Sequence, residues 1–401
     1  MEYSDSAHKE RENDNSTDIA VRKEPEGGTT SNNKKPRFID KLKKFWSNPK
    51  NRIVVEAVLG VIVILVVGLI LRRWYSENNN SGANNTIKSA TTKSDTAVVE
   101  TAPSILDGTL VPKALSTRHP LGVMVENHVD ARPQSGLSAA GLVYEAIAEG
   151  GITRYLAFFS GYDIAKIGPI RSARTYYVDI AKGFNAYFAH VGGNYNALSL
   201  IKSINVLDLD QFANPAAYWR DTSRRVATEH TVYSSTEKLY SLAAKKQFTS
   251  DNTFTPLKFK VDAAEAARPA SQKVKIEFSS DGYTDTFNYD PKTNTYPRSI
   301  GSLPDQDIET GKRIAPKNLI LQEVTRSAIV TVINEKGYAY DLSSGGKVTI
   351  FQDGKQVIGT WKHPNDSDRT FYYDSTGKEI ELNPGQTWVC LTHPDIRTTI
   401  E

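Results

Sequence analysis

Short apolar runs alternate with longer helix-like stretches in the middle of the chain. The strand-like runs are rich in Val, Leu, Ala and aromatic residues, and Gly, Pro, Asn or Asp ends each one; they lie at 121–125, 155–159 and 186–191. The helix-like stretches lie at 172–182, 195–203 and 235–245. Alternation of strands and helices predicts a mixed α/β domain, which we place at residues 105–250.

The pattern changes after Phe254 to short segments in which apolar and polar residues alternate. KVKIEFSS at 273–280 and TWVCLTH at 387–393 are two of them. Asp353-Gly354 separates two such runs by two residues, the strongest short-range signal for a β-hairpin. We therefore predict a smaller β-rich domain without a long helix over residues 251–401.

The N-terminal part has a different composition. Residues 1–33 carry almost no apolar side chains, which predicts a disordered tail. Residues 34–52 form a basic juxtamembrane segment, and residues 53–71 are apolar except for Glu56. A helix of that length would span roughly 28 Å, enough for a bilayer core, so we predict a single transmembrane helix acting as an uncleaved signal anchor.

The basic flank sets the expected orientation. Because Lys and Arg accumulate on the cytoplasmic side of a membrane segment, the N-terminus is expected in the cytoplasm and the folded domains outside it. The Ser-, Asn- and Thr-rich composition of residues 72–104 predicts a flexible tether. This places the protein at a cell membrane as a single-pass, extracytoplasmic envelope protein.

Overall charge and cysteine content narrow the function classes. A net charge of +3 does not favour nucleic-acid binding, and none is predicted. The single cysteine, Cys390, cannot form an internal disulfide and is expected to be a small buried apolar residue.

Charged residues are unusually dense among the apolar residues of 119–179. Such charges are costly unless they are paired or used on a ligand, so this block is the expected site. Arg171 and Arg174 follow Gly168-Pro169 at an expected helix start, where they could clamp an anion. Pairing with Glu145 and Glu149 is the alternative, and the sequence does not decide between them.

Glu145 and Glu149 are four residues apart and would share a face of either a helix or a strand. Two acids on one face could form a general acid/base pair. We favour the other interpretation, in which they are partners of arginines that include Arg154.

Gly192-Gly193 lies between a strand ending near His190 and a helix starting near Asn194. This order is typical of the ligand-binding edge of an α/β sheet, although neither a phosphate loop nor a dinucleotide fingerprint is present. His190 is a candidate base, but a satisfied structural histidine is the more common case. His230 is a candidate ligand-binding residue, and because no HxH or HExxH spacing occurs, no metal and no cofactor are predicted.

Several motifs resemble those of the YerB-type lipoprotein family, a bacterial family of unknown function. They are NHVDARPQSGLSAAGLVYEAIAEGGITRYLAFF, IGPIRSARTYYVDIA, HVGGNYNAL and EHTVYSS, with FQDGKQVIGTW and LNPGQTWVCL towards the C-terminus. The resemblance covers residues 105–394 and implies two extracytoplasmic domains without an established reaction. The family's lipobox cysteine is missing, so residues 53–71 would replace the lipid, and Asn194 stands where a GGS-type turn has serine.

Three functions remain open from the sequence. The favoured one is a binding module for an anionic envelope ligand, polymer or partner protein, using Arg171, Arg174 and the Gly192-Gly193 turn. Arg154, Asn194 and His230 are its further candidate ligand-binding residues. A second is an envelope hydrolase acting on a glycan or phosphoester, with Glu145, Glu149 or His190 in catalysis. A third is a purely structural ectodomain whose charges satisfy one another.

Overall fold

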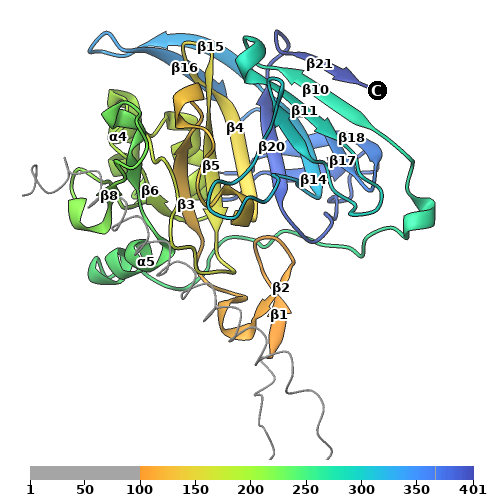
Figure 1. Ribbon diagram of the computed structural model, residues 1–401, viewed down its shortest axis with the longest axis horizontal. Coiled ribbons are helices and arrows are strands. Elements are labelled where there is room, and N and C mark those ends of the chain that lie inside the picture. Colours follow the sequence, from red (N-terminus) through yellow and green to blue (C-terminus); the bar gives the residue numbers. More distant parts are fainter. Residues whose placement is uncertain (1–99, 366) are drawn as a thin grey trace, which may run out of the picture. The chain divides into compact units, whose positions relative to one another are not determined.

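The computed structural model describes residues 100–365 and 367–401 (Figure 1). The predicted tail, basic segment and apolar segment 53–71, and nearly all of the tether, lie outside the described residues. Within the described part of the chain, no helix combines the length and apolar character needed to cross a membrane. The structure thus gives no support to the predicted transmembrane helix.

A ten-stranded mixed sheet forms the centre of the described protein. Its order is β19 (Phe371–Asp374), β18 (Lys355–Lys362), β17 (Gly346–Gln352), β14 (Asn318–Glu323), β20 (Thr387–Thr392), β4 (Leu142–Glu149), β5 (Ile152–Phe159), β3 (Leu121–Glu126), β6 (Tyr187–Ala189) and β7 (Leu207–Asp208). Strands from both ends of the described chain meet in it, because β20 pairs in parallel with β4 (Figure 1).

This sheet corrects the predicted fold class. We expected a mixed α/β ectodomain followed by a separate β-rich domain, but the described part of the chain is mostly β-sheet with few helices, and its largest sheet draws on both segments. The described α-helices are short: α3 (Thr175–Gly183), α4 (Tyr195–Ser203) and α5 (Thr236–Lys245). The hydrophobic pattern shows that a strand is buried but does not identify the strand it pairs with. The sequence therefore did not predict the pairing of β4 with β20.

A five-stranded antiparallel sheet packs on one face of the central sheet. Its order is β13 (Leu303–Pro304), β12 (Arg298–Ile300), β11 (Thr284–Asn288), β10 (Lys273–Glu277) and β21 (Arg397–Ile400). Val274, Ile276 and Phe287 of this sheet share a core with Tyr155 and Trp388, and α5 joins the same core. Helices α3 and α4 pack on the opposite face, with Leu156, Phe158 and Phe188.

Short elements complete the fold. The two-stranded sheets are β1 (Thr101–Pro103) with β2 (Leu110–Pro112), β8 (Trp219–Arg220) with β9 (Val232–Tyr233), and β15 (Thr325–Val330) with β16 (Lys336–Asp341). The 3₁₀ helices are η1 (Lys113–Leu115), η2 (Val129–Ala131), η3 (Leu137–Ala139), η4 (Pro215–Ala217), η5 (Thr228–His230), η6 (Glu265–Ala267) and η7 (Asp281–Tyr283). Tyr340 of β16 donates to the carbonyl of Ile147 at 3.0 Å, which fixes that hairpin over the end of β4.

The predicted hairpin at Asp353-Gly354 is confirmed between β17 and β18. Both residues have positive φ, 55° and 69°, as a type I′ turn requires. Asp353 also anchors its surroundings, since its carboxylate accepts hydrogen bonds from Lys260, Asn294 and Asn383. Burial alone would raise the pKa of Asp353, but these hydrogen bonds outweigh it and lower the pKa to about 2.

Replacing Asp353 with asparagine is expected to remove an acid-sensitive part of the stability. A carboxyl whose pKa is lowered on folding stabilises the protein above its unfolded pKa of about 3.9, and this contribution disappears as pH falls through the folded value. After allowing for solvent screening, Asp353→Asn should be less stable than the native chain by about 1 kcal/mol at pH 6. Urea unfolding at pH 6, 4 and 2.5 should show that the difference in free energy of unfolding between the two proteins decreases as pH falls. A difference that is independent of pH would contradict this role of Asp353.

Candidate functional site

Four strands deliver polar side chains to one edge of the central sheet. β3, β6 and β7 run in parallel, and β4 runs the same way because β3 and β4 are both antiparallel to β5. Their carboxyl ends therefore meet at a common edge, where sheets with parallel strands hold their ligands. Glu126 ends β3, Glu149 ends β4, Asp208 ends β7, and His190 directly follows β6.

Glu126 organises the first of two charged clusters at this edge. One carboxylate oxygen lies 3.0 Å from Nε of Arg171, and the other lies 2.9 Å from Nδ1 of His230. The Glu126 side chain is only 4% exposed, whereas 27% of the Arg171 side chain remains accessible. The His230 ring stacks on His128 with centroids 4.9 Å apart. A buried carboxylate here fixes both an arginine and a histidine.

Glu149 organises the second cluster. Its carboxylate accepts a hydrogen bond from Nη2 of Arg154 and one from Nε of Arg174, the latter at 2.9 Å. Burial would raise the pKa of Glu149, but the two guanidinium groups outweigh it and lower the pKa. Glu149 is thus ionised at neutral pH and lacks the proton that a general acid needs.

The arginines do not form the predicted clamp at a helix start. Helix α3 begins at Thr175 with Arg174 as its N-cap, so Arg171 lies outside the first turn. Arg171 pairs with Glu126, and Arg174 pairs with Glu149. The pairing alternative therefore describes the observed contacts, although Glu126 takes the place expected for Glu145.

Glu145 and Glu149 lie on opposite faces of β4, contrary to the prediction. An irregularity in the pairing of β4 with β5 falls between Ile147 and Glu149, which breaks the two-residue repeat. Glu145 faces the five-stranded sheet and contacts Arg298, whereas Glu149 faces Arg154 and Arg174. The two acids cannot act as a pair on one substrate.

Glu145 belongs to a closed ionic cluster between the two sheets. Arg298 donates to Glu145 at 3.0 Å, to Asp285 at 2.8 Å and to Asp305. The Glu145, Asp285 and Arg298 side chains are 0% exposed. Burial raises the pKa of Asp285 well above its usual range, even though Arg298 lowers it. Because the Glu145 side chain has no access to solvent, its role is structural.

His190, Gly192 and Asn194 satisfy one another and their neighbours. The buried His190 ring places Nδ1 2.8 Å from the carbonyl of Gly192 and Nε2 2.9 Å from the Asp208 carboxylate. The N–H of Gly192 donates to Asp210, and Asn194 caps α4 by accepting from the N–H of Ala197. The predicted strand, glycine turn and helix are present at residues 187–203, and both ring nitrogens of His190 are occupied.

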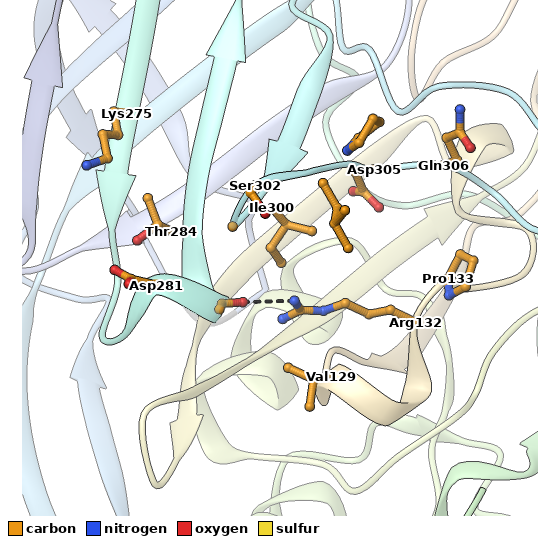
Figure 2. Close-up of a pocket in the computed structure, with 14 residues that line it drawn as sticks. Val129, Arg132, Pro133, Lys275, Asp281, Thr284, Ile300, Ser302, Asp305 and Gln306 are labelled. Carbon is orange, nitrogen blue, oxygen red and sulfur yellow. Dashed lines mark hydrogen bonds between the residues drawn. The ribbon is translucent and has the colours of Figure 1, made fainter.

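The sequence interpretation missed two features beside the Glu126 cluster. The first is a cavity of about 710 Å³ between η2 and the five-stranded sheet, lined by Val129, Arg132, Pro133, Lys275, Asp281, Gly282, Thr284, Ile300, Gly301, Ser302, Leu303, Pro304, Asp305 and Gln306 (Figure 2). The second is a group of donor atoms from His128, Asp130 and His230, all within 4.8 Å of one another. The His-x-Asp spacing of 128–130 was the available signal for it.

Comparison with known proteins identifies the family of this chain. Models of the DUF3048 N-terminal and C-terminal domains, both described as protein of unknown function, match residues 106–249 and 274–389. The chain belongs to the DUF3048 family. It is 34% identical over 311 residues to YerB of Bacillus subtilis (strain 168), which is named as a candidate lipoprotein, covering 75% of this chain and 88% of that protein.

The DUF3048 fold is also known from experiment. The crystal structure of the YerB protein from Bacillus subtilis matches with a TM-score of 0.66 and 32% sequence identity, covering 75% of this chain and 99% of that chain. The resemblance to YerB-type lipoproteins read from the sequence is thereby confirmed.

Cys390, the single cysteine of this DUF3048 chain, is fully buried in β20, as the sequence predicts. Burial raises the pKa of its thiol, which leaves it in the unreactive protonated form.

Proposed function

We propose that this protein is an extracytoplasmic envelope protein that binds an anionic envelope ligand in the cavity beside η2. The likeness to YerB, named as a candidate lipoprotein, supports the envelope location. The cavity supports ligand binding, since its volume of about 710 Å³ is within the range of small-molecule sites. It adjoins the carboxyl edge of β3, where the fold gathers its polar side chains.

The fixed guanidinium of Arg132 is the observation that carries this proposal. Nε donates to the side-chain oxygen of Asn127 at 2.8 Å, Nη2 to the carbonyl of Asn127 at 3.0 Å, and Nη1 to the carbonyl of Gly282 at 2.8 Å. Figure 2 shows Arg132 extending from the end of η2 towards that carbonyl. Each terminal nitrogen keeps a second N–H, so the group is held in place with two donors available for an anion.

The remaining lining suits an anion attached to a less polar portion. Val129, Ile300 and Leu303 give the cavity an apolar wall, and Ser302 offers a hydroxyl. Asp305 does not oppose an anion strongly, because its carboxylate is paired with Arg298. Binding energy would thus come from a charge-assisted contact with Arg132 and from apolar burial.

Filling the cavity is expected to abolish binding without unfolding the protein. Ser302 is exposed at the cavity, so Ser302→Trp should block the space, and Arg132→Gln should remove the charge. The matched control is Ser203→Trp, at an exposed residue on α4. Isothermal titration with poly(glycerol phosphate) and with soluble peptidoglycan fragments should show one ligand whose affinity falls at least about tenfold in both cavity variants.

Two results would refute the proposal. One is that neither class of probe binds the native chain. The other is that binding is equally strong in Ser302→Trp and in the Ser203→Trp control.

A further inference from the structure

We propose that His128, Asp130 and His230 bind a divalent transition metal of the zinc class at the carboxyl edge of β3. His128 and Asp130 flank Val129 at the start of η2, and His230 ends η5. One donor atom from each residue lies within 4.8 Å of the other two. The segments that supply them are about a hundred residues apart in sequence, and the fold alone brings them together.

The orientation of His230 favours a metal ligand. Its Nδ1 lies 2.9 Å from Oε2 of Glu126, and Glu126 is held in turn by Arg171 through Oε1. Since a carboxylate only accepts, Nδ1 is the donor in this contact, and in the neutral ring Nε2 keeps its lone pair. Among the described residues none is hydrogen-bonded to that Nε2. A histidine fixed by a carboxylate on one nitrogen with the other nitrogen available is the usual arrangement at metal sites.

The loop that carries His128 and Asp130 is fixed by Arg224. Its guanidinium donates to the carbonyls of Ala131 at 3.0 Å and Pro133 at 3.2 Å, and also to those of Asp130 and Arg132. The loop backbone is therefore set before any ion binds, while the side chains of His128 and Asp130 remain 31% and 63% exposed. In the structure His128 stacks on His230, with ring centroids 4.9 Å and planes 12° apart, so its ring must turn out of this stack before both imidazoles can direct a lone pair at one ion. The exposure of His128 and Asp130 leaves room for that rotation.

The donor set selects the class of ion. Magnesium and calcium require several oxygen ligands, whereas Asp130 supplies the single carboxylate of this group. Arg171 contacts Glu126 and Arg224 contacts the backbone of Asp130, and the positive charges of both arginines repel a cation. Binding must therefore come from directional metal–ligand bonds and not from charge alone. Two imidazoles and one carboxylate suit zinc, with bonds of about 2.0–2.2 Å, and three protein ligands leave a fourth position open. The donor atoms then need to approach one another by roughly 1 Å or more.

The chain contains a matched control for this site. His393 and Asp395 have the same His-x-Asp spacing, and Nδ1 of His393 lies 2.7 Å from Asp395. No third histidine, cysteine or carboxylate joins them in a metal-ligand group within the described residues. His393→Ala therefore tests for weak binding by an isolated histidine and aspartate pair.

Metal titration of the full-length, metal-free chain tests the proposal. We expect one equivalent of Zn²⁺ to be withdrawn from a chromophoric chelator, and Co²⁺ in its place to give visible absorption bands. His230→Ala and Asp130→Asn should each weaken binding at least tenfold, and His393→Ala should leave it unchanged. Glu126→Gln, which removes the carboxylate behind His230, should weaken binding about 10- to 100-fold without abolishing it.

Asp130→Asn keeps the test decisive if His230→Ala destabilises the fold, because Asp130 is largely exposed. Binding that persists in Asp130→Asn, or that is lost in His393→Ala, would overturn the site. The readout is the metal itself, so failure of this proposal is independent of ligand binding in the cavity.

Discussion

Replacing Arg298 with methionine is expected to lower the free energy of unfolding by about 3–5 kcal/mol, the cost of leaving buried charges without their partner. Arg298 is fully buried between the two sheets, and its guanidinium is the shared donor to Glu145, Asp285 and Asp305. It also lies over the Trp388 ring, 4.5 Å from its centroid. Methionine would preserve much of the volume but none of the hydrogen bonds.

The loss should depend on pH in a defined direction. Burial raises the pKa of both Asp285 and Asp305 above their usual values. A group with a raised pKa favours folding most below its unfolded pKa, and this benefit falls as pH rises towards the folded value. Without Arg298 the carboxyl groups must be protonated to remain buried, so the variant should be penalised more at pH 8 than at pH 5.

Denaturant unfolding at these two pH values measures the effect. Arg397→Met is the matched control, because the Arg397 side chain is 76% exposed and its replacement should change stability by no more than about 0.5 kcal/mol. If Arg298→Met unfolds at the same denaturant concentration as the control, the ionic cluster does not stabilise the contact between the sheets.

Replacing Glu149 with glutamine should lower the free energy of unfolding by about 2 kcal/mol, between the values for exposed and fully buried ion pairs. The variant keeps the shape of the side chain but leaves Arg154, whose side chain is 3% exposed, without its anion. Arg174 loses the same partner. Glu149 itself is 35% exposed, which limits the loss relative to Arg298→Met.

The Glu149 effect has the opposite pH dependence. The pKa of Glu149 is lowered in the folded protein, so its contribution is present above the unfolded value of about 4.3 and is lost as pH falls through the folded value. The melting temperature of Glu149→Gln should therefore lie below that of the native chain at pH 7, and the two melting temperatures should converge in acid. Glu100→Gln, at a residue 73% exposed, serves as control, and an equal shift in the two variants would contradict the argument.

Local elements could be predicted from the sequence because short-range patterns specify them. The runs at 121–125 and 155–159 lie in β3 and β5, and the stretch at 195–203 is helix α4. The turn at Asp353-Gly354 followed from the backbone demands of two residues. Each of these features depends on neighbours within a few positions.

The charged site was only partly predictable for the same reason. The expected block does contain Glu126, Arg154, Arg171 and Glu149, but their pairings depend on the fold. Arg298 is 153 residues from Glu145 in sequence, so no local pattern could link them. A single irregularity near Ile147 places Glu149 on the opposite face of β4 from the one predicted. The alternation of residues along a strand does not show where a bulge interrupts it.

The pairing of β4 with β20 also shapes how the protein is made. Glu145 and Trp388, which meet across this joint, are 243 residues apart, a distance that a ribosome covers in about 10–50 s. Throughout that interval β4 has β5 on one side and an open edge on the other, and open edges recruit foreign strands. β20 closes this edge, and it is among the last strands to be synthesised.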